Sequence, residues 1–504
     1  MKFKTRKTWK NDSENQVVQP LRQYQPRSLK EVIQIVQEAE KHNLQVKAIG
    51  SGHSWSDVVV TTDCLVKPER LNKVLRLDTS LLNDSVDTSD LIHVESGLSI
   101  RDLNKELDSR GLALPNMGGY DAQTIIGAIS TSTHGSGIEL GPFDTIVASL
   151  ELVSDGGTVY RIEPTDGITN QTEFNKKYPD RKLIQDDEWL NAAVVSMGCM
   201  GVIYSVILHV VKKFWLEEVR TLSTWEQVKR DLKKGDVLKN NRHYELYLDP
   251  YKKNGQHTCL VTVRNVTNEI QNLSPDKKNR NFFSEFLASI PFVRKIMNFV
   301  FRLEPKIAPD VIQGALEGLV DDGYTNVSYK VFHIGRASRI TAISQEIGFP
   351  LKDDAYLAAI DRFLEMAEEN RSLGKLYHNS PVTIRFVKAS NAFLSMMHGY
   401  DTCMVEIILM KGTHGGFEMM QRYENELYKF SGRPHWGQLN TLTYDVIKSL
   451  YPEFDTWFGV YKKLNQNGTF SSPFTKRVGF SKEIVQQPLE STVSDATVTA
   501  ATHA

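Results

Sequence analysis

This chain of 504 residues has few cysteines, almost no net charge and no hydrophobic run of membrane-spanning length. Its four cysteines are widely separated and show neither disulfide-framework nor metal-ligand spacing. They are Cys64, Cys199, Cys259 and Cys403. We therefore expect buried thiols, a reducing, cytoplasmic location and no metal site.

The charges nearly cancel, since 60 Lys and Arg residues face 61 Asp and Glu residues. A chain so balanced has no overall field to attract nucleic acid or anionic membranes. The basic start, residues 1–7, leads into Asn11, Asp12 and Glu14 rather than an apolar core, so it is not typical of a secretory signal. We expect a small-molecule partner and no nucleic acid.

The amino-terminal part of the chain alternates between strand and helix patterns, which predicts an α+β domain. Ser28 and Glu31 form a capping-box pattern at a helix start. The apolar residues of that helix share one face: Val32, Ile35, Val36 and Ala39. A strand over 45–49 follows, and a second strand over 91–95 precedes a helix capped by Ser99. Asp155-Gly156-Gly157, set between two apolar runs, predicts a hairpin turn.

The strand over 45–49 leads into a glycine turn, Gly50-Ser51-Gly52-His53-Ser54. Glycines let the backbone approach a diphosphate closely, and a histidine held beside an isoalloxazine ring can be joined to it covalently. On this motif alone, a hydrogen-bonding loop histidine is the more common interpretation. The third glycine of a nicotinamide-binding Rossmann fingerprint is missing, which disfavours that class.

Two further small-residue segments follow at 114–137 and 196–203. The first joins Gly118 and Gly119 to a run of hydroxyls, Ser130 to Thr133, and ends in His134-Gly135-Ser136-Gly137. Hydroxyls and freed backbone N–H groups can bind a diphosphate without a metal. The sequence therefore predicts a second phosphate cradle downstream of the first.

With these motifs, the chain resembles the vanillyl-alcohol-oxidase-like flavoproteins, and within them the sugar-1,4-lactone and alditol oxidases. The most specific matches are Gly50 to Ser54, Thr133 to Gly137, and Arg433-Pro434-His435-Trp436-Gly437. The resemblance implies an α+β fold, with a two-subdomain, PCMH-type FAD-binding domain followed by a substrate (cap) domain with an antiparallel sheet. It also implies FAD attached covalently through His53.

The resemblance further implies domain boundaries and a set of FAD-binding positions. The expected segments are a lead-in at 1–17, an FAD-binding domain at 18–213, a substrate domain at 214–440 with a helical insertion near 280–320, a carboxyl-terminal segment at 441–483 returning to the FAD domain, and a disordered tail at 484–504. The implied FAD-binding residues are Gly50, Ser51, Gly52, His53, Ser54, Gly118, Gly119, Thr124, Gly127, Thr131, Thr133, His134, Gly135, Gly137, Gly201, Val202 and His435.

The strand pattern Val382-Thr383-Ile384-Arg385-Phe386 supplies the expected catalytic arginine. Thr383 and Arg385 fall on one face, and Ile384 and Phe386 form a core-facing pair on the other. Arg385, which matches the family, can hold a substrate oxygen and stabilise the charge that develops as hydride leaves. A surface arginine on an edge strand is the less favoured interpretation.

Two departures from the family pattern affect the expected mechanism. Thr383 stands where relatives have glutamate, and Gln438 stands where they have lysine beside the flavin N1. Glu406, a single carboxylate in the apolar run 403–409, matches a position where relatives place histidine or asparagine. Its expected partner is Arg385, because an unpaired buried carboxylate is costly. A catalytic base and a structural ion pair are equally favoured roles for Glu406.

The expected reaction is oxidation of a carbinol group of a sugar lactone or polyol, with O2 as electron acceptor and H2O2 as product. Gly118 leaves space where relatives that exclude oxygen tend to have a bulkier residue. Two alternatives stay open: a dehydrogenase that reduces a quinone or cytochrome, and a flavin-binding protein with weak chemistry. The apolar insertion over 282–303 could touch a membrane interface, making the protein peripheral, but a helical pair packed on the substrate sheet is favoured.

Overall fold

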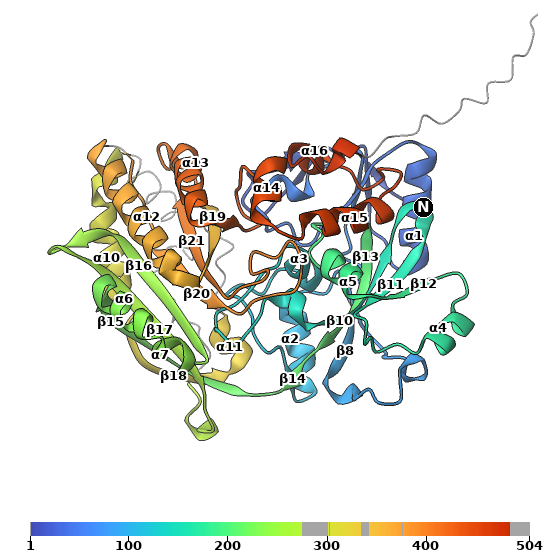
Figure 1. The fold of residues 1–504 in the computed structure, drawn as a ribbon, viewed down its shortest axis with the longest axis horizontal. Helices are drawn as coiled ribbons and strands as arrows, with labels where there is room; N and C mark the ends of the chain where they lie inside the picture. The colour runs from blue at the N-terminus through green and yellow to red at the C-terminus, as the bar shows by residue number, and fades with distance from the viewer. Residues whose placement is uncertain (1, 275–300, 302, 334–341, 375, 484–504) are drawn as a thin grey trace, which may run out of the picture.

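The computed structural model describes residues 2–274, 301, 303–333, 342–374 and 376–483. Figure 1 shows two lobes side by side: one is built from the middle of the chain, and the other combines the amino-terminal part with the last helices. The middle of the chain therefore forms a unit of its own, and the two ends of the described chain meet in the other lobe.

The first sheet of the amino-terminal lobe has four strands in the order β1-β4-β6-β5. Its elements are β1 (Lys4–Thr5), β4 (Arg22–Tyr24), α1 (Leu29–Lys41), β5 (Val46–Ala48) and β6 (Cys64–Val66). The predicted α1 is confirmed, since Ser28 Oγ accepts a hydrogen bond from Glu31 N and the four predicted apolar residues are buried. The Glu31 carboxylate accepts from Arg27 N at 2.7 Å. The short strands β2 (Trp9–Lys10) and β3 (Val17–Val18) form a separate arm.

The second sheet of this lobe has six strands in the order β12-β11-β10-β13-β8-β7. Its strands are β7 (Val74–Leu75), β8 (Leu91–Glu95), β10 (Val147–Val153), β11 (Val159–Glu163), β12 (Lys182–Gln185) and β13 (Val202–His209). The helices are α2 (Ile100–Ser109), α3 (Ile125–Ser130), α4 (Gln171–Lys177) and α5 (Asp187–Ala193). The predicted hairpin is confirmed, because β10 and β11 pair antiparallel across the turn at 155–157. Strand β9 (Leu112–Ala113) pairs with β14 (Val211–Lys212).

The middle lobe is built on an eight-stranded sheet in the order β18-β15-β17-β16-β20-β21-β19-β22. The strands are β15 (Trp215–Thr224), β16 (His243–Lys253), β17 (Gln256–Val266), β18 (Asp321–Val327), β19 (Ala342–Pro350), β20 (Val382–Val387), β21 (Thr402–Met410) and β22 (Arg433–Pro434). All of its pairings are antiparallel, as expected for the cap domain.

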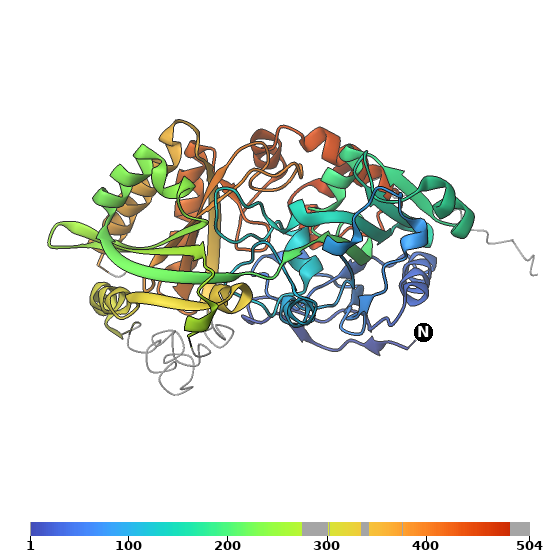
Figure 2. The same cartoon turned by 90° about the horizontal axis from the view of Figure 1, so that it is seen from below.

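Helices cover both faces of this sheet, as the two views show together (Figures 1 and 2). They are α6 (Trp225–Lys234), α7 (Asp236–Lys239), α10 (Ala308–Glu317), α11 (Ser328–Phe332), α12 (Ala355–Ser372) and α13 (Gly416–Leu427). Helices α6, α12 and α13 pack on the face that buries Ile384 and Phe386. In Figure 2, α10 lies on the opposite side of the sheet from α6 and α12. The two-residue period thus separates an apolar face from the face that bears Arg385.

The carboxyl-terminal helices return to the amino-terminal lobe, where Figure 1 shows them beside α5 and above α3. They are α14 (Tyr444–Leu450), α15 (Phe454–Leu464) and α16 (Pro473–Arg477). Trp457 on α15 is fully buried and its indole N–H donates to Ala192 O at 3.1 Å. The core of the amino-terminal lobe is therefore completed by the last part of the described chain.

No helix among these described residues is both long and apolar enough to cross a bilayer. Most of the predicted apolar insertion and the predicted tail lie outside the described residues; of the insertion region, α10 is described. The four cysteines are buried and unpaired, as expected.

Candidate flavin site and catalytic face

The glycine turn after β5 is held by hydrogen bonds from the amino-terminal arm. Asn11 donates from Nδ2 to Ser54 O at 3.0 Å, and Asn15 donates to Trp55 O at 2.7 Å. Gly52 has φ +81°, a left-handed conformation that suits glycine. Within the described part of the chain, the main-chain N–H groups of residues 50–54 donate no hydrogen bond to a protein acceptor. The loop therefore presents a row of free donors.

His53 projects from this loop with its side chain mostly buried. Its Nε2 lies 3.4 Å from the hydroxyl of Tyr120, whose ring packs edge-on against the imidazole at a centroid distance of 4.7 Å. Its Nδ1 lies 3.5 Å from the Asp12 carboxylate. Both ring nitrogens thus face polar groups from other segments, and the ring is oriented by them.

Several glycines of the predicted cradle lie so close to neighbouring protein atoms that a side chain would collide with them. A Cβ on Gly50 would lie 2.5 Å from Thr124 Oγ1, and one on Gly135 would lie 2.3 Å from Asn116 Oδ1. Gly201 has φ +150° and would place a Cβ 2.6 Å from Val153 O. Close backbone approach and free N–H groups are what a dinucleotide cradle requires, so these residues fit FAD.

The hydroxyl groups of the second cradle have different hydrogen-bond partners. Thr131 Oγ1 donates to Gly127 O at 3.1 Å and lies 3.3 Å from Thr133 Oγ1. Ser132, with φ +55°, is fully buried and donates to Asp144 at 2.7 Å. Because its hydroxyl is committed to that buried carboxylate, Ser132 serves the structure of the loop.

Arg385 lies on β20, a central strand, and its guanidinium is tied to Glu245 of β16. Arg385 Nε donates to Glu245 Oε1 at 2.8 Å, and Arg264 Nη1 donates to Glu245 Oε2, also at 2.8 Å. Glu218 in turn pairs with Arg264 at 2.5 Å and with Arg220 at 3.1 Å. A continuous row of buried charges therefore runs across the sheet from Arg220 to Arg385.

Glu406 lies beyond Arg385 in this row and is not the solitary carboxylate that its apolar strand suggests. Its Oε2 lies 3.6 Å from Arg385 Nη1, so the predicted pairing exists, but the closer carboxylate partner of Arg385 is Glu245. Across the strand pair β19–β21, Glu346 is the register partner of Glu406. Thr383 is the partner of Glu406 on the other side.

Gln438 bridges these two carboxylates. Its Nε2 donates to Glu346 Oε2 at 3.2 Å and to Glu406 Oε1 at 3.1 Å. Glu346 Oε1 lies 3.3 Å from His134 Nε2, an imidazole of the second glycine loop. The amide that was expected to face the flavin N1 is thus directed to the acid pair, and Glu346 connects that pair to the loop.

The ionisation of these acids is set by burial and by their neighbours. Burial opposes the charge on Glu245, yet Arg385 and Arg264 lower its pKa to about 2. Burial and the charge of Glu346 raise the pKa of Glu406, and Arg385 only partly offsets them. For Glu346 burial again opposes ionisation, but His134, with His435 and Arg385, holds its pKa below the usual range. Two neighbouring carboxylates therefore differ in proton affinity, which is typical of acid–base sites.

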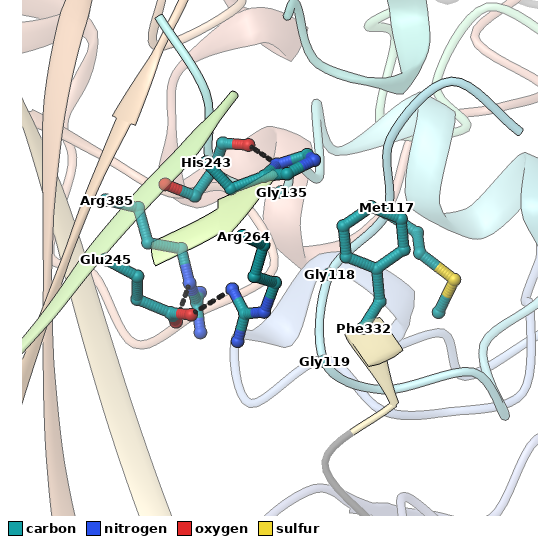
Figure 3. Close-up of a pocket in the computed structure, with 10 residues that line it drawn as sticks. Met117, Gly118, Gly119, Gly135, His243, Glu245, Arg264, Phe332 and Arg385 are labelled. Carbon is teal, nitrogen blue, oxygen red and sulfur yellow. Dashed lines mark hydrogen bonds and ion pairs between the residues drawn. The ribbon is translucent and has the colours of Figure 1, made fainter. Parts of the chain in front are cut away.

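A pocket lies between this charged face and the second glycine segment, 114–137 (Figure 3). On one side its lining includes Gly118, Gly119 and Gly135. Arg385, Glu245 and Arg264 line the other side, and Figure 3 shows their side chains gathered at one end, away from Met117 and Phe332. The cavity thus brings Arg385 opposite Gly118 and Gly119, whereas Glu406, Gln438 and the His53 loop are not among its lining residues.

His435 and Trp436 connect the acid pair to the core. Trp436 is fully buried, and its indole N–H donates to Leu394 O at 2.6 Å. His435 Nδ1 accepts from Gly437 N at 3.0 Å, and burial lowers the pKa of this imidazole to about 4. His435 is therefore neutral and helps to fix the segment that carries Gln438.

Sequence reasoning missed Glu245, Arg264 and Glu346. A weak signal existed for Glu245, which stands between Tyr244 and Leu246, whereas Arg264 and Glu346 each have one polar neighbour. Such a pattern indicates a buried charge that needs a partner. The partners come from strands and loops far away in the chain, so pairing could not be read from the pattern.

The chain matches two family models: "FAD binding domain" over residues 20–163 and "D-arabinono-1,4-lactone oxidase" over residues 206–478. An L-gulono-1,4-lactone dehydrogenase from Mycobacterium tuberculosis (strain H37Rv) is 27% identical over 93% of this chain and 98% of its own length. L-gulonolactone oxidase from Bos taurus is 26% identical over 90% of this chain and 94% of its own. A crystal structure of cholesterol oxidase from B. sterolicum has a TM-score of 0.76 at 15% identity, covering 95% of this chain and 97% of that one, and shows the shared fold.

Fold and site thus define an FAD-dependent oxidoreductase with an α+β, PCMH-type architecture. The second match covers more than half of the chain, and the protein belongs to the D-arabinono-1,4-lactone oxidase family.

Proposed function

We propose that this protein oxidises a carbinol group of an aldono-1,4-lactone or a related polyol, with O2 as electron acceptor. The observation that supports it best is the pocket between the second glycine segment, 114–137, and the charged face that bears Arg385. The similar proteins from Mycobacterium tuberculosis and Bos taurus are named for an aldonolactone. One is named a dehydrogenase and the other an oxidase, so the acceptor is a separate part of the proposal.

In this proposal, bound FAD supplies the hydride acceptor, and the protein binds the substrate and removes its hydroxyl proton. Arg385 holds the substrate oxygen, because its guanidinium faces the pocket and is fixed by Glu245. Glu406 accepts the proton. Its raised pKa makes the carboxylate a stronger base once it is ionised. Thr383, beside Glu406, contributes no charge. Glu406, on the next strand, therefore takes the role of the acid that relatives have at the position of Thr383.

Gln438 fixes Glu406 instead of contributing a charge beside the flavin. Its amide reaches both acids of the pair, so its two hydrogens are used within the protein. Gly118, on the other wall of the pocket, would leave an open path for O2. The neutral hydroxyls of a lactone or polyol suit this wall of paired charges, since each guanidinium there already has a carboxylate partner.

The experiment is a screen of purified protein with aldonolactones and polyols, run in air with peroxide detection and anaerobically with a quinone or cytochrome as acceptor. We expect peroxide release in air. Flavin reduction without peroxide, followed by fast reduction of the added acceptor, would favour the dehydrogenase. A yellow protein inert to all these substrates would favour a flavin-binding protein with weak chemistry.

The base is tested with Glu406→Gln. We expect flavin content to be retained and the anaerobic rate of flavin reduction to fall about 100- to 10,000-fold, the usual contribution of a general base. Glu424→Gln is the matched control, because Glu424 is a buried acid of the same lobe whose partners are Gln345 and Tyr428, whereas Glu406 pairs with Arg385. An unchanged rate in Glu406→Gln would leave this acid with a structural role only.

The proposal includes covalent attachment of FAD to His53, supported by the position of this imidazole on a loop of free N–H groups. Mass spectrometry of the peptide containing His53 tests it directly. We expect a mass increment in the wild type, and loss of the increment with retention of noncovalent flavin in His53→Ala. An unmodified peptide from a yellow protein would contradict the attachment and leave the oxidase proposal intact.

A further inference from the structure

The acids and bases around Glu346 do not balance in charge. The buried row on the cap sheet holds four glutamates and three arginines among the described residues. The glutamates are Glu218, Glu245, Glu346 and Glu406; the arginines are Arg220, Arg264 and Arg385. Arg220 and Arg264 form ion pairs with Glu218 and Glu245. The nearest carboxylate to Arg385 is also that of Glu245. Burying an uncompensated carboxylate is costly, so Glu346 and Glu406 need additional positive charge or protons.

The hydrogen bonds of His134 indicate where one such proton lies. His134 Nδ1 is 2.9 Å from Gly135 O, and a carbonyl can only accept, so Nδ1 bears a hydrogen. In a neutral imidazole Nε2 would then present a lone pair. That lone pair would face Glu346 Oε1 at 3.3 Å, an oxygen that has no hydrogen-bond donor among the described residues. Two facing lone pairs repel, so a proton belongs between them.

A second proton position is Glu406. The Glu346 and Glu406 side chains are opposite each other across β19 and β21, where paired Cβ atoms are about 5 Å apart. One amide, that of Gln438, donates to both. Arg385 Nη1 lies 3.6 Å from Glu406 and 3.9 Å from Glu346, too far to neutralise either as fully as it neutralises Glu245 at 2.8 Å. Carboxylates this close do not both remain ionised without a counter-charge.

We propose that His134, Glu346 and Glu406 form a proton-holding cluster: Glu346 stays ionised beside a protonated His134, and Glu406 takes up and releases the proton of the reaction. Glu346 is a positioning residue, since it contacts His134 and Gln438 and acts through Glu406. The role in turnover rests on the proposed function; the cluster itself does not. In the step assigned to it, the substrate O–H bond breaks, its proton forms an O–H bond on Glu406, and the hydride of the adjacent C–H goes to the flavin.

The groups facing the cluster are known from each neighbouring element. Arg385 on β20 and Glu245 on β16 lie on the substrate side, and Ser344 Oγ of β19 donates to Glu406 at 3.2 Å. His435 lies on the other side with its ring centroid 6.1 Å from that of His134. Burial lowers the pKa of His435 to about 4 and the neighbouring carboxylates raise that of Arg385, so His435 is neutral and Arg385 stays charged. A titrating carboxylic-acid signal that depends on both acids therefore reports on the Glu346–Glu406 pair.

Infrared titration of the purified full-length protein tests the cluster without substrate. We expect a titrating carboxylic-acid band that is present in the wild type and absent in Glu406→Gln. In Glu346→Gln the same band should titrate about one pH unit lower, because the neighbouring negative charge is gone. Glu424→Gln, which removes a buried acid outside the cluster, should leave the Glu406 band in place.

A second variant and a second readout make the result decisive. Glu346→Asp keeps the negative charge but places it farther from Glu406, because the side chain is shorter. The titration of the Glu406 band should therefore shift in the same direction as in Glu346→Gln, but by less. Glu346→Asp replaces Glu346→Gln if the latter does not fold. The acid limb of the anaerobic flavin-reduction rate should move with the band. Identical titrations in wild type and Glu406→Gln, or no shift in either Glu346 variant, would overturn the cluster. The predicted band shifts in a protein that oxidises no substrate would instead refute the proposed function.

Discussion

Arg477 of α16 binds both carboxylate oxygens of Asp57, with Nε at 3.0 Å and Nη2 at 2.7 Å. Asp57 begins the short helix that follows the flavin loop, so the pair joins the last α-helix of the described chain to the segment after His53. The same guanidinium donates from Nη1 to Leu442 O at 3.0 Å. The carboxyl-terminal segment is thus fixed to the loop that would hold the flavin.

Replacing Arg477 by Met should lower the free energy of unfolding by about 1–2 kcal/mol, since the pair is bidentate but partly exposed. Thermal unfolding of the flavin-loaded protein measures it. Arg110→Met is the control, because Arg110 makes an exposed pair with Glu106 within one helix and should cost little. Equal midpoints for the two variants would show that the Arg477 pair adds nothing beyond a surface ion pair.

Gly118→Ala tests the proposed route for O2. A Cβ at this position would lie 3.1 Å from His134 O and would extend into the pocket, so the fold can accept it with a small shift. We expect the rate of flavin reoxidation by O2 to fall at least about tenfold, with flavin reduction by substrate nearly unchanged. Stopped-flow measurement follows the two half-reactions separately. An unchanged reoxidation rate would contradict the proposed O2 route past Gly118.

Lys47, on the strand that leads to His53, should make stability depend on pH in the alkaline range. It is fully buried, donates to Met197 O at 2.6 Å, and burial lowers its pKa from 10.5 to about 8. Between these values the unfolded chain binds a proton that the folded protein does not, so stability rises with pH by up to about 3 kcal/mol. Denaturant unfolding should show this rise in the wild type, and Lys47→Met should lack it.

Glu245 should contribute to stability in the opposite pH range. Its pKa is lowered to about 2 by two arginines, against a usual value of 4.5. Its contribution is complete above about pH 4.5 and is lost as pH falls towards 2. Glu245→Gln should destabilise the protein by about 3–5 kcal/mol at neutral pH, because Arg264 and Arg385 lose a buried partner. Its unfolding free energy should also fall less between pH 4.5 and 2, and an equal fall in both proteins would contradict the assignment.

The local elements near the flavin loop could be predicted because their signals are local. The cap at Ser28, the apolar stripe of α1 and the turn at 155–157 depend on residues within a few positions of each other. The separation of Ile384 and Phe386 from Arg385 follows from the strand period alone. The pairing of Arg385 with Glu245 did not follow, because 140 residues separate them.

The sequence alone determined the class of the protein, since the spaced glycine motifs and His53 are written in single short segments whose backbone requirements only a few residues can satisfy. Only the tertiary structure decided which acids face Arg385, why Lys47 is buried under an otherwise apolar strand, and how Gln438 joins Glu346 to Glu406. The physical reason is that a buried charge is stabilised by the partners that surround it in space. Strand register brings those partners from distant parts of the chain, and a one-residue slip would turn each of them to the other face.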